Sequence, residues 1–327
     1  MIVLDFSKQK FDTFDESIQW QKEIKNFYED WKSDADFIIA HTSGSTGNPS
    51  PIKLPKSAMK LSAQMTGDFF DLTKGKTALL CMPVNFIAGK MMLVRAIELE
   101  LKLYCMQPKA TIDLSSIDEV DFAPLTPMQV EKSFQQMNKI NTLLIGGAPL
   151  SDVLRERLLK LETVSYESYG MTETITHIGL KQICEQYFNV LNQIQIRKDE
   201  RNCLVIQTPY FKEEIITNDI VEIKNKNAFK WLGRFDNVIN SGGIKLIPEQ
   251  IEKKLKPIIN AEFIISSLPD PILGEKLILI IESKEFEINL PENLLDKYEY
   301  PKEIYFFEKF PRTESNKIKR QDLLNLL

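Results

Sequence analysis

Apolar runs alternate with runs of helical spacing between residues 34 and 170. The runs "ADFIIA" and "TALLCMPV" are almost continuously apolar, which predicts strands buried on both faces. Apolar residues recur every three or four positions in "KSAMKLSAQMTGDFF" and "AGKMMLVRAIELE", as in amphipathic helices. Ser151 precedes "DVLRERLLKLE" and predicts a helix start. The alternation predicts an α/β domain whose mostly parallel sheet is covered by helices on both faces.

The pattern changes after about residue 191. Here "IQIRK", "NCLVIQTPYF", "EIITNDIVEIK" and "AFKWLGR" predict strands joined by polar turns, and hence a small antiparallel β subdomain over about residues 191–235. Beyond "GRFDNVINSGG" we expect a helix, two strands and a helix–strand–helix end. The chain is therefore expected to have a large N-terminal domain, residues 1–235, and a small mobile α+β lid domain, residues 236–327.

Composition narrows the class of protein. The 327 residues carry a formal net charge of −5, whereas a general nucleic-acid binder is more often basic. The chain has two histidines, which exclude a histidine-rich metal site and give little support to a Ser-His-Asp triad. The N-terminal residues lack the apolar core of a signal peptide, and no apolar run is long enough to span a bilayer. We therefore expect a cytoplasmic protein with no membrane insertion.

The cysteine pattern also favours a cytoplasmic protein. The chain has four of them: Cys81, Cys105, Cys184 and Cys203. None belongs to a C-x-x-C pair, and three lie inside apolar runs. The pattern predicts reduced thiols in the core rather than a metal site or a disulfide framework.

The loop "HTSGSTGNPSPIK", residues 41–53, follows the first predicted strand. Its hydroxyls, and the backbone N–H groups that glycine leaves accessible, can surround an anion. A kinase-type phosphate loop would read G-x-x-x-x-G-K-[ST], and the only "GKT", Gly75 to Thr77, has Phe70 where the first glycine belongs. The loop is either a phosphate site of another class or an ordinary Ser/Gly turn.

Five segments together resemble one enzyme superfamily. "TSGSTGNP" resembles the phosphate loop of the adenylate-forming superfamily, which includes acyl-CoA and aryl-CoA synthetases, luciferase-like enzymes and peptide-synthetase adenylation domains. "YGMTET" looks like its ATP and magnesium motif, and "TNDIVEI" like its T-G-D segment with Asn218 in place of Gly. "GRFDNVINSGGIKLIPEQIE" looks like its hinge, and "PRTESNKIKR" like its C-terminal lysine segment with Asn316 in place of Gly. Because all five follow the family's order, the chain is identified as a member of this superfamily.

The resemblance implies a reaction in two steps. A carboxylate attacks the α-phosphate of ATP and expels pyrophosphate, and a thiol then attacks the acyl-adenylate. ATP, Mg²⁺ and coenzyme A are the implied cofactor and co-substrates. The implied ATP-binding residues are Thr42, Ser43, Gly44, Ser45, Thr46, Gly47, Gly146, Gly147, Ala148, Pro149, Glu167, Ser168, Tyr169, Gly170, Met171, Asp219 and Arg234.

Three residues carry the implied catalysis. Lys317, a mobile cation, would stabilise the negative charge that develops between the carboxylate and the α-phosphate. Thr172 would donate a hydrogen bond to the α-phosphate, and Glu173 would help to bind Mg²⁺. Each residue has a simpler alternative. Lys317 would be a solvated lysine of the tail, Thr172 a helix N-cap, and Glu173 an acid stabilised at a helix N-terminus.

The resemblance also implies a moving lid. Asp236 would be the hinge, with a surface turn residue as the alternative. Gly242 and Gly243 would line the path of the coenzyme A arm, with a plain β-turn as the alternative. The usual phosphate-loop lysine falls at Ser50. Lys53 faces the opposite side of an extended strand from residue 50, so we expect the loop to work without this lysine.

The short region before the phosphate loop points to one group within the superfamily. Typical relatives have a much longer region before the phosphate loop, and the chain is most like the short o-succinylbenzoate–CoA ligases of menaquinone biosynthesis. "MPVNFIAGKMMLVRA" and "YESYGMTETITHI" resemble their segments. Their substrate has two carboxylates, and the candidate binding residues are Phe86, Lys90, Arg95 and His177. Each has an alternative: Phe86 in the core, Lys90 snorkelling, Arg95 on a solvent face and His177 as a hydrogen-bonded wall residue.

Two other functions stay open at this point. One is another acyl-CoA or aryl-CoA ligase, or an enzyme that loads a carrier protein. The other is a degenerate, non-catalytic nucleotide-binding homologue, which Asn218 and Asn316 would suit. In each case the expected partners are small molecules, and the sequence gives no oligomeric state.

Overall fold

The computed structural model describes residues 1–41, 51–312 and 318–327. The expected phosphate-loop residues from Thr42 to Gly47, together with Ser50 and Lys317, therefore lie outside the described residues.

The chain forms two compact units. Unit 1 comprises Met1–Gln195 and Gln207–Ile215, and unit 2 comprises Ile196–Ile206 and Ile216–Leu327. Most of the expected β subdomain thus lies in the same unit as the C-terminal residues, and the expected domain boundary at residue 235 stays a prediction.

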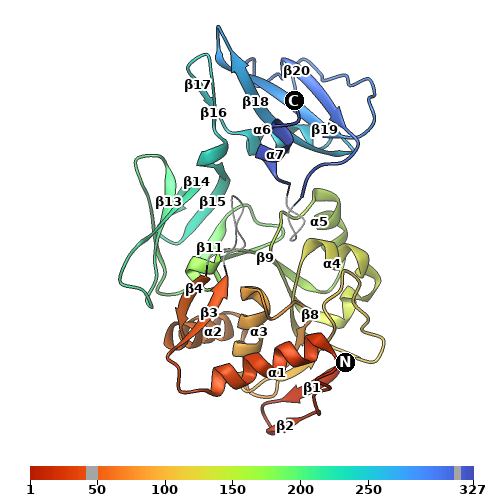
Figure 1. Cartoon of the computed structure of the whole chain (residues 1–327), viewed down its shortest axis with the longest axis vertical. Helices are drawn as coiled ribbons and strands as arrows, with labels where there is room; N and C mark the ends of the chain where they lie inside the picture. The colour runs from red at the N-terminus through yellow and green to blue at the C-terminus, as the bar shows by residue number, and fades with distance from the viewer. Residues whose placement is uncertain (42–50, 313–317) are drawn as a thin grey trace. The chain divides into compact units, whose positions relative to one another are not determined.

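Unit 1 is built on an extended sheet with the strand order β11-β10-β9-β8-β7-β5-β6-β1-β2. Strands β1, β2, β8, β9 and β11 are labelled in Figure 1. In chain order these strands are β1 (Ile2–Asp5), β2 (Lys10–Phe11), β5 (Thr77–Leu80), β6 (Lys102–Cys105), β7 (Val120–Leu125), β8 (Ile140–Ile145), β9 (Val164–Gly170), β10 (His177–Gln182) and β11 (Phe188–Val190). Strands β6, β5, β7, β8 and β9 pair in parallel, while β1 and β10 are antiparallel to their neighbours in that block. The α/β class with a parallel central sheet is confirmed.

Helices cover both faces of the parallel strands. They are α1 (Gln19–Lys32), α2 (Lys56–Phe70), α3 (Ile87–Glu98), α4 (Pro127–Lys132) and α5 (Asp152–Leu158). Leu143 of β8 shares a buried cluster with Leu154 of α5. Phe122 of β7 lies on the other face and packs against Phe70 of α2, with ring centroids 5.1 Å apart. Alternate residues of a strand point to opposite faces, so the near-continuous apolar runs are explained. Ser151 caps α5 as predicted, because its Oγ accepts from the Leu154 N–H at 3.2 Å.

The first predicted strand does not join this sheet. Strand β3 (Phe37–His41) pairs antiparallel with β4 (Pro51–Pro55), His41 opposite Pro51, in a separate two-stranded sheet. We had expected it to open the parallel series. An antiparallel partner that lies ten residues along the chain satisfies its backbone groups locally, and the phosphate-loop segment connects the two strands.

Unit 2 contains two groups of strands. The first, in the order β12-β13-β14-β15, consists of β12 (Gln195–Lys198), β13 (Cys203–Gln207), β14 (Ile215–Asn225) and β15 (Ala228–Arg234). The second, in the order β17-β16-β19-β18 with β20 beside β19, consists of β16 (Ile239–Ser241), β17 (Ile244–Leu246), β18 (Glu262–Asp270), β19 (Gly274–Glu282) and β20 (Glu303–Phe307).

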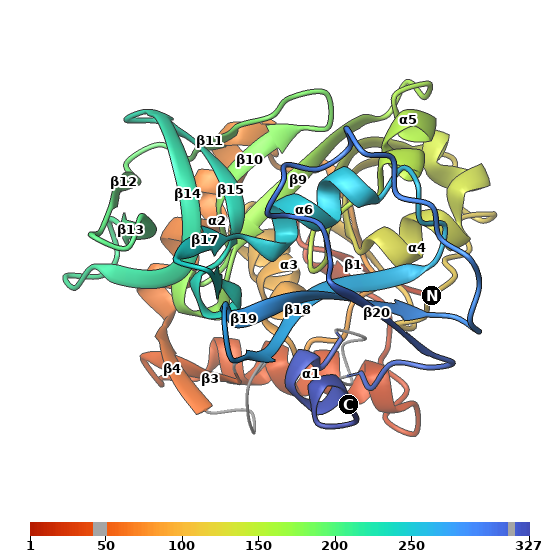
Figure 2. The same cartoon turned by 90° about the horizontal axis from the view of Figure 1, so that it is seen from above.

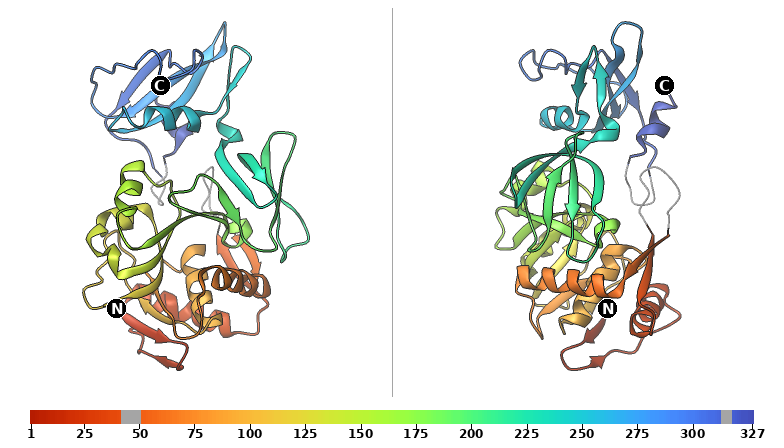
Figure 3. Two further views of the ribbon diagram at one scale, coloured as in Figure 1. Left: turned by 180° about the vertical axis from the view of Figure 1, so that it is seen from behind. Right: turned by 90° about the vertical axis from the view of Figure 1, so that its left-hand side faces the viewer.

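Two helices lie on opposite faces of the second sheet. Helix α6 (Pro248–Leu255) packs beside β18 (Figure 2). Its Leu255 shares a buried cluster with Ile265. Helix α7 (Arg320–Leu324) is the dark blue helix next to the C-terminus in Figure 3. Its Leu323 shares a buried cluster with Ile264, which is the neighbour of Ile265 and therefore faces the other side of the sheet.

The helix expected before β20 is absent from the described residues 283–302, which form turns. Prolines stand at residues 291 and 301 within this segment, and Tyr300 donates its hydroxyl to the Pro291 carbonyl at 2.6 Å, which closes the chain between them into a loop. The leucines of this segment pack onto the sheet from irregular backbone.

The cysteine prediction is largely confirmed. Cys81, Cys105, Cys184 and Cys203 are all free. The first two and the last are buried, but Cys184 is exposed, because it follows the end of β10 in a turn. Within the described ranges, the structure has no helix that combines the length and the apolar character needed to cross a membrane.

Candidate active site

The motif "YGMTET" runs from the end of β9 into a short 3₁₀ helix, Thr172–Thr174, before the chain turns back into β10. Gly170 pairs with His177 across the two strands. A Cβ at Gly170 would lie 2.4 Å from the Thr176 carbonyl oxygen and 2.5 Å from the His177 Cα. Glycine is therefore required because the returning chain passes directly over this position.

Ile175 stands at the tip of that turn in an unusual conformation. Its φ is 66° and its ψ is −52°, and the Thr176 N–H donates to the Thr174 carbonyl at 2.7 Å, which makes a γ-turn with positive φ. The side chain is fully buried. A β-branched residue in this region costs on the order of 1–3 kcal/mol, and such strain is concentrated at functional sites.

The "GGAP" segment, which ends with Ala148 and Pro149, follows β8 at the carboxyl edge of the parallel strands. Ser168 of β9 donates its hydroxyl to the Ile145 carbonyl at 3.1 Å. A Cβ at Gly146 would lie only 2.6 Å from that hydroxyl oxygen, and Gly147 has a φ of 86°. The structure thus brings Gly146, Gly147 and Ser168 together at the edge where open α/β sheets bind ligands.

Glu167 and Tyr169 flank Ser168 on β9. The Glu167 carboxylate pairs with Arg155 at 2.5 Å and Lys181 at 3.2 Å, so its charge is balanced within unit 1. The Tyr169 ring packs against Phe188 with centroids 5.9 Å apart. Their roles beside an adenine stay predictions.

Thr172 is buried, whereas Glu173 is exposed. In the part of the chain that the structure describes, no three His, Cys, Asp or Glu side chains gather into a metal site. Mg²⁺ commonly takes one or two protein carboxylates and completes its shell with phosphate oxygens and water, and the role of the exposed Glu173 carboxylate in binding it stays a prediction. Met171 accepts the Thr174 N–H through its carbonyl and holds the 3₁₀ turn closed.

A buried cation lies next to this motif. Arg95 of α3 is 2 % exposed and donates from its NH2 group to the Thr176 hydroxyl at 2.8 Å. Its Nε has no hydrogen-bond partner, and no carboxylate pairs with the guanidinium among the described residues. Burial lowers the pKa of Arg95 to about 9. A guanidinium buried without an anion is costly, so the site is suited to receive a negatively charged group.

His177 is buried beside Arg95. Its Nε2 lies 3.2 Å from the Thr66 hydroxyl, and its Nδ1 lies 3.3 Å from the Thr176 hydroxyl. Burial, and secondarily the Arg95 charge, lowers the pKa of His177 well below its ordinary value, so the imidazole is neutral at pH 7. The sequence did not single out Thr66 or Thr176. Thr176 lies inside a quoted motif, whereas nothing in the sequence of α2 marks Thr66.

The other two acyl-pocket candidates differ from Arg95. Lys90 donates to the Val84 carbonyl at 2.8 Å and lies 5.0 Å from the centroid of Phe27, so its ammonium group is already engaged. Phe86 is 47 % exposed at the start of α3, which is inconsistent with a core role. The solvent-face alternative for Arg95 is likewise wrong, because the helix turns this side chain inward.

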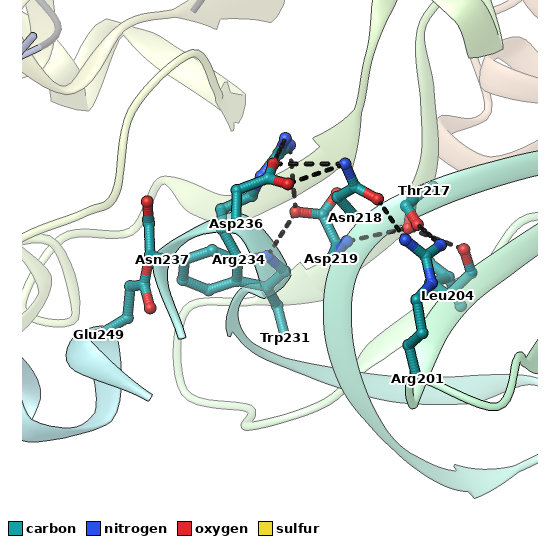
Figure 4. A network of polar contacts seen from close by, with 10 residues as sticks. All are labelled: Arg201, Leu204, Thr217, Asn218, Asp219, Trp231, Arg234, Asp236, Asn237 and Glu249. Atoms are coloured by element: carbon teal, nitrogen blue, oxygen red, sulfur yellow. Dashed lines mark hydrogen bonds and ion pairs between the residues drawn. The ribbon is translucent and has the colours of Figure 1, made fainter. Parts of the chain in front are cut away.

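Unit 2 holds the expected ribose-binding residues. Asp219 of β14 is opposite Arg234 of β15, and the Arg234 NH1 group lies 3.6 Å from the Asp219 carboxylate. Trp231 donates its Nε1–H to the same carboxylate at 3.0 Å (Figure 4). Asp219 is 5 % exposed, which fits an acceptor that is already oriented before a ligand arrives.

Asn218, which replaces the family's glycine, joins this network. Its amide nitrogen donates to the Asp236 carboxylate, and its amide oxygen accepts from Arg201 at 2.8 Å (Figure 4). Arg234 also pairs with Asp236 at 2.9 Å. The asparagine therefore ties the candidate hinge residue to β14 and to Arg201.

Gly242 and Gly243 form the two-residue turn between β16 and β17 and are not part of a strand. Ser241 pairs with Ile244, and the two glycines have φ values of 60° and 83°. A turn with positive φ at both central residues has the hand that suits a twisted hairpin, and it strongly favours glycine. A role towards coenzyme A is compatible with this turn but stays a prediction.

The lysines near the phosphate loop point elsewhere. Lys53 lies over the Phe37 ring, 4.7 Å from its centroid, and Phe37 is at the end of the hairpin far from the loop. Lys56 donates to the Ser33 carbonyl at 2.7 Å. Both ammonium groups thus have partners among the described residues, and the expectation that the loop works without its usual lysine stays a prediction.

The described residues on either side of residues 313–317 pair with each other. Arg312 and Ile318 form an antiparallel bridge, and the Lys319 N–H donates to the Pro311 carbonyl at 2.9 Å. Arg320 pairs with the half-buried Glu252 at 2.7 Å, which explains this part of the basic tail as structural.

Comparison with known proteins supports the same family. The family model for the AMP-binding enzyme matches residues 1–201. A 2-succinylbenzoate–CoA ligase from Bacillus cytotoxicus is 24% identical over 96% of this chain and 75% of its own length. A crystal structure of an acyl-CoA synthetase (AMP-forming)/AMP-acid ligase II-like protein from Dyadobacter fermentans is 35% identical and covers 100% of both chains, with a TM-score of 0.67.

A further solved structure is similar in fold. The O-succinylbenzoate coenzyme A synthetase from Bacillus subtilis, in complex with ATP and magnesium ion, is 20% identical over 88% of this chain and 69% of its own, with a TM-score of 0.76. The family model covers more than half of the chain, and the Dyadobacter relative matches its whole length. The chain therefore belongs to the AMP-binding enzyme family of AMP-forming acid–CoA ligases.

Proposed function

We propose that this protein activates an acid with two carboxylates, most specifically o-succinylbenzoate in menaquinone biosynthesis, by forming an acyl-adenylate and then a coenzyme A thioester. The observation that carries the choice of acid is the buried Arg95 guanidinium without a carboxylate partner among the described residues. A second carboxylate on the substrate would supply the missing anion through charge-assisted hydrogen bonds. His177 and Thr176 would complete the wall around it.

The nucleotide half of the proposal rests on the residues that the family resemblance assigns to it. Gly146, Gly147 and Ser168 would lie against the adenosine, and Thr172 would donate to the α-phosphate. Asp219 and Arg234 would hold the ribose and phosphate. Magnesium, when bound to Glu173 and phosphate oxygens, would neutralise phosphate charge. Lys317 would stabilise the charge of the transition state.

The departures from the family pattern do not favour a degenerate homologue. Asn218 has well-formed partners, and the Asp219–Arg234 pair next to it is intact. The thiol step is proposed for coenzyme A, with Asp236 as the hinge. ATP and coenzyme A as substrates fit a cytoplasmic enzyme.

Substrate preference tests the role of Arg95. We expect pyrophosphate release with o-succinylbenzoate to exceed that with either monoacid lacking one carboxylate by about 100-fold, because a buried cation left unpaired rejects the monoacid. Arg95→Met should reduce this preference to within about tenfold, while the matched control Arg157→Met, at an exposed ion pair with Glu131, should keep it. A wild-type preference for a monoacid would rule out the proposed substrate class.

A further inference from the structure

The segment from residue 207 to residue 215 connects β13 and β14 but belongs to unit 1. Its Tyr210 donates the phenolic hydroxyl to the Thr174 carbonyl oxygen at 2.8 Å. Gln207 orders the same loop by donating to the Phe211 carbonyl at 2.8 Å. The contact therefore comes from an ordered loop that lies about 35 residues further along the chain than the motif it touches.

The acceptor of this bond is part of the strained turn. The Thr174 carbonyl already accepts the Thr176 N–H in the γ-turn, so Tyr210 adds a second donor to the oxygen that closes it. The Thr174 hydroxyl accepts from the Met171 N–H at 2.9 Å and donates to the Thr176 carbonyl at 2.7 Å. Burial raises the pKa of Tyr210, so its phenol keeps the proton it donates.

The turn separates the two halves of the candidate site by a few residues. Thr172 and Glu173 precede it on the nucleotide side. Thr176 and His177 follow it on the acyl side, where the Thr176 hydroxyl accepts a hydrogen bond from the buried Arg95 guanidinium. Because Ile175 is held at a positive φ, release of the turn would let both sides move.

We propose that Tyr210 is a positioning residue, which holds the Thr174 carbonyl and thereby fixes the nucleotide motif and the acyl pocket relative to each other. The inference rests on the proposed function for its kinetic consequences. The local restraint stands on the geometry alone. Tyr210 itself contacts neither half through a catalytic group, and its effect is transmitted by the backbone of residues 172–176.

Tyr210→Phe tests this, with Tyr300→Phe as the matched control, because Tyr300 also donates to a backbone carbonyl, that of Pro291. We expect Tyr210→Phe to raise the KM values for ATP and for the acid together, and to lower kcat/KM for pyrophosphate release about tenfold, with an almost unchanged melting temperature. Amide hydrogen exchange at Ile175 and Thr176 should accelerate about tenfold in Tyr210→Phe and stay unchanged in Tyr300→Phe.

Unchanged exchange at these amides would overturn the inference. So would kinetic constants within twofold of the wild type, or a shift in only one of the two KM values. If the wild-type protein released no pyrophosphate with any acid, the proposed function would fall, and the exchange measurement would still decide whether Tyr210 restrains the turn.

Discussion

The amide nitrogen of Asn218 lies 3.1 Å and 3.3 Å from the two carboxylate oxygens of Asp236. A glycine at residue 218, as the family pattern has it, could not make this contact. The candidate hinge is therefore bound to β14 by a side chain that the family pattern lacks. A rotation of the backbone at Asp236 would have to break this bond.

Asn218→Gly should consequently speed the thioester half-reaction. The lost hydrogen bond corresponds to about a threefold to tenfold change in the rate of thioester formation from a supplied adenylate. Rapid-quench measurement of each half-reaction separates this effect from adenylation, which should change less. Asn227→Gly, on the exposed turn of the same hairpin, is the control for the added backbone freedom. Equal rates in Asn218→Gly and the wild type would argue against a restraint at the hinge.

Lys317→Ala should nearly abolish adenylate formation and spare thioester formation from a supplied adenylate. A lost transition-state cation is expected to reduce the rate of the first step by about 100-fold to 1,000-fold. Lys319→Ala provides the matched control, because Lys319 pairs with Asp322 at 3.3 Å and should leave both rates unchanged. A comparable loss in both half-reactions would remove the assigned role of Lys317.

Glu173→Gln should weaken the binding of Mg²⁺ and so the magnesium-dependent turnover. Replacing a charged oxygen ligand by a neutral amide is expected to raise the Mg²⁺ concentration for half-maximal pyrophosphate release about tenfold. Titration of the metal after its removal by a chelator provides the measurement. Glu156→Gln on the exposed face of α5 is the control. An identical magnesium titration for Glu173→Gln and the wild type would contradict the proposal for Glu173.

The buried His177 predicts a pH dependence of stability. Its pKa is lowered in the folded state, so the unfolded chain takes up a proton first as the pH falls below about 6.5. The stability that the neutral imidazole contributes is present above that pH and is lost as the pH falls towards the folded pKa.

Between pH 7.5 and pH 5.5 this contribution should lower the free energy of unfolding by roughly 1.4 kcal/mol. Urea unfolding at the two pH values measures this fall in the free energy of unfolding. In His177→Asn the fall should be smaller than in the wild type by the same roughly 1.4 kcal/mol. The chain's only other histidine, His41, provides the control His41→Asn. A decrease that is the same in His177→Asn and the wild type would show that His177 is not responsible.

The sequence predicted the central sheet because its signal is strong and local. The parallel strands are short apolar runs, and α2 was anticipated over Lys56–Phe70, the range in which it forms. The pairing of β3 with β4 and the turns before β20 were missed, because both depend on contacts that periodicity does not encode. The N-terminal strand β1 joins β6 about 100 residues further along the chain, a pairing that no local pattern indicates.

The site was predictable to the extent that motifs define it. Gly146, Gly170 and Asp219 were identified because they belong to sequence motifs. The structure explains the two glycines, because the space of a Cβ is occupied by a serine hydroxyl at Gly146 and by the returning strand at Gly170. Thr66 and Tyr210 were not found, because each acts through a single hydrogen bond formed only by the fold. Asn218 was interpreted as a departure from the family's motif, whereas the structure shows its side chain hydrogen-bonded to Asp236 and Arg201.

The most direct test of the account is a pyrophosphate-release screen across carboxylic acids, with and without coenzyme A. We predict ATP- and magnesium-dependent release that is highest with o-succinylbenzoate, and formation of its thioester only when coenzyme A is present. No release with any acid would contradict the enzymatic proposal, and release that is strongest with monocarboxylic acids would contradict the assignment of the buried Arg95 to a second carboxylate.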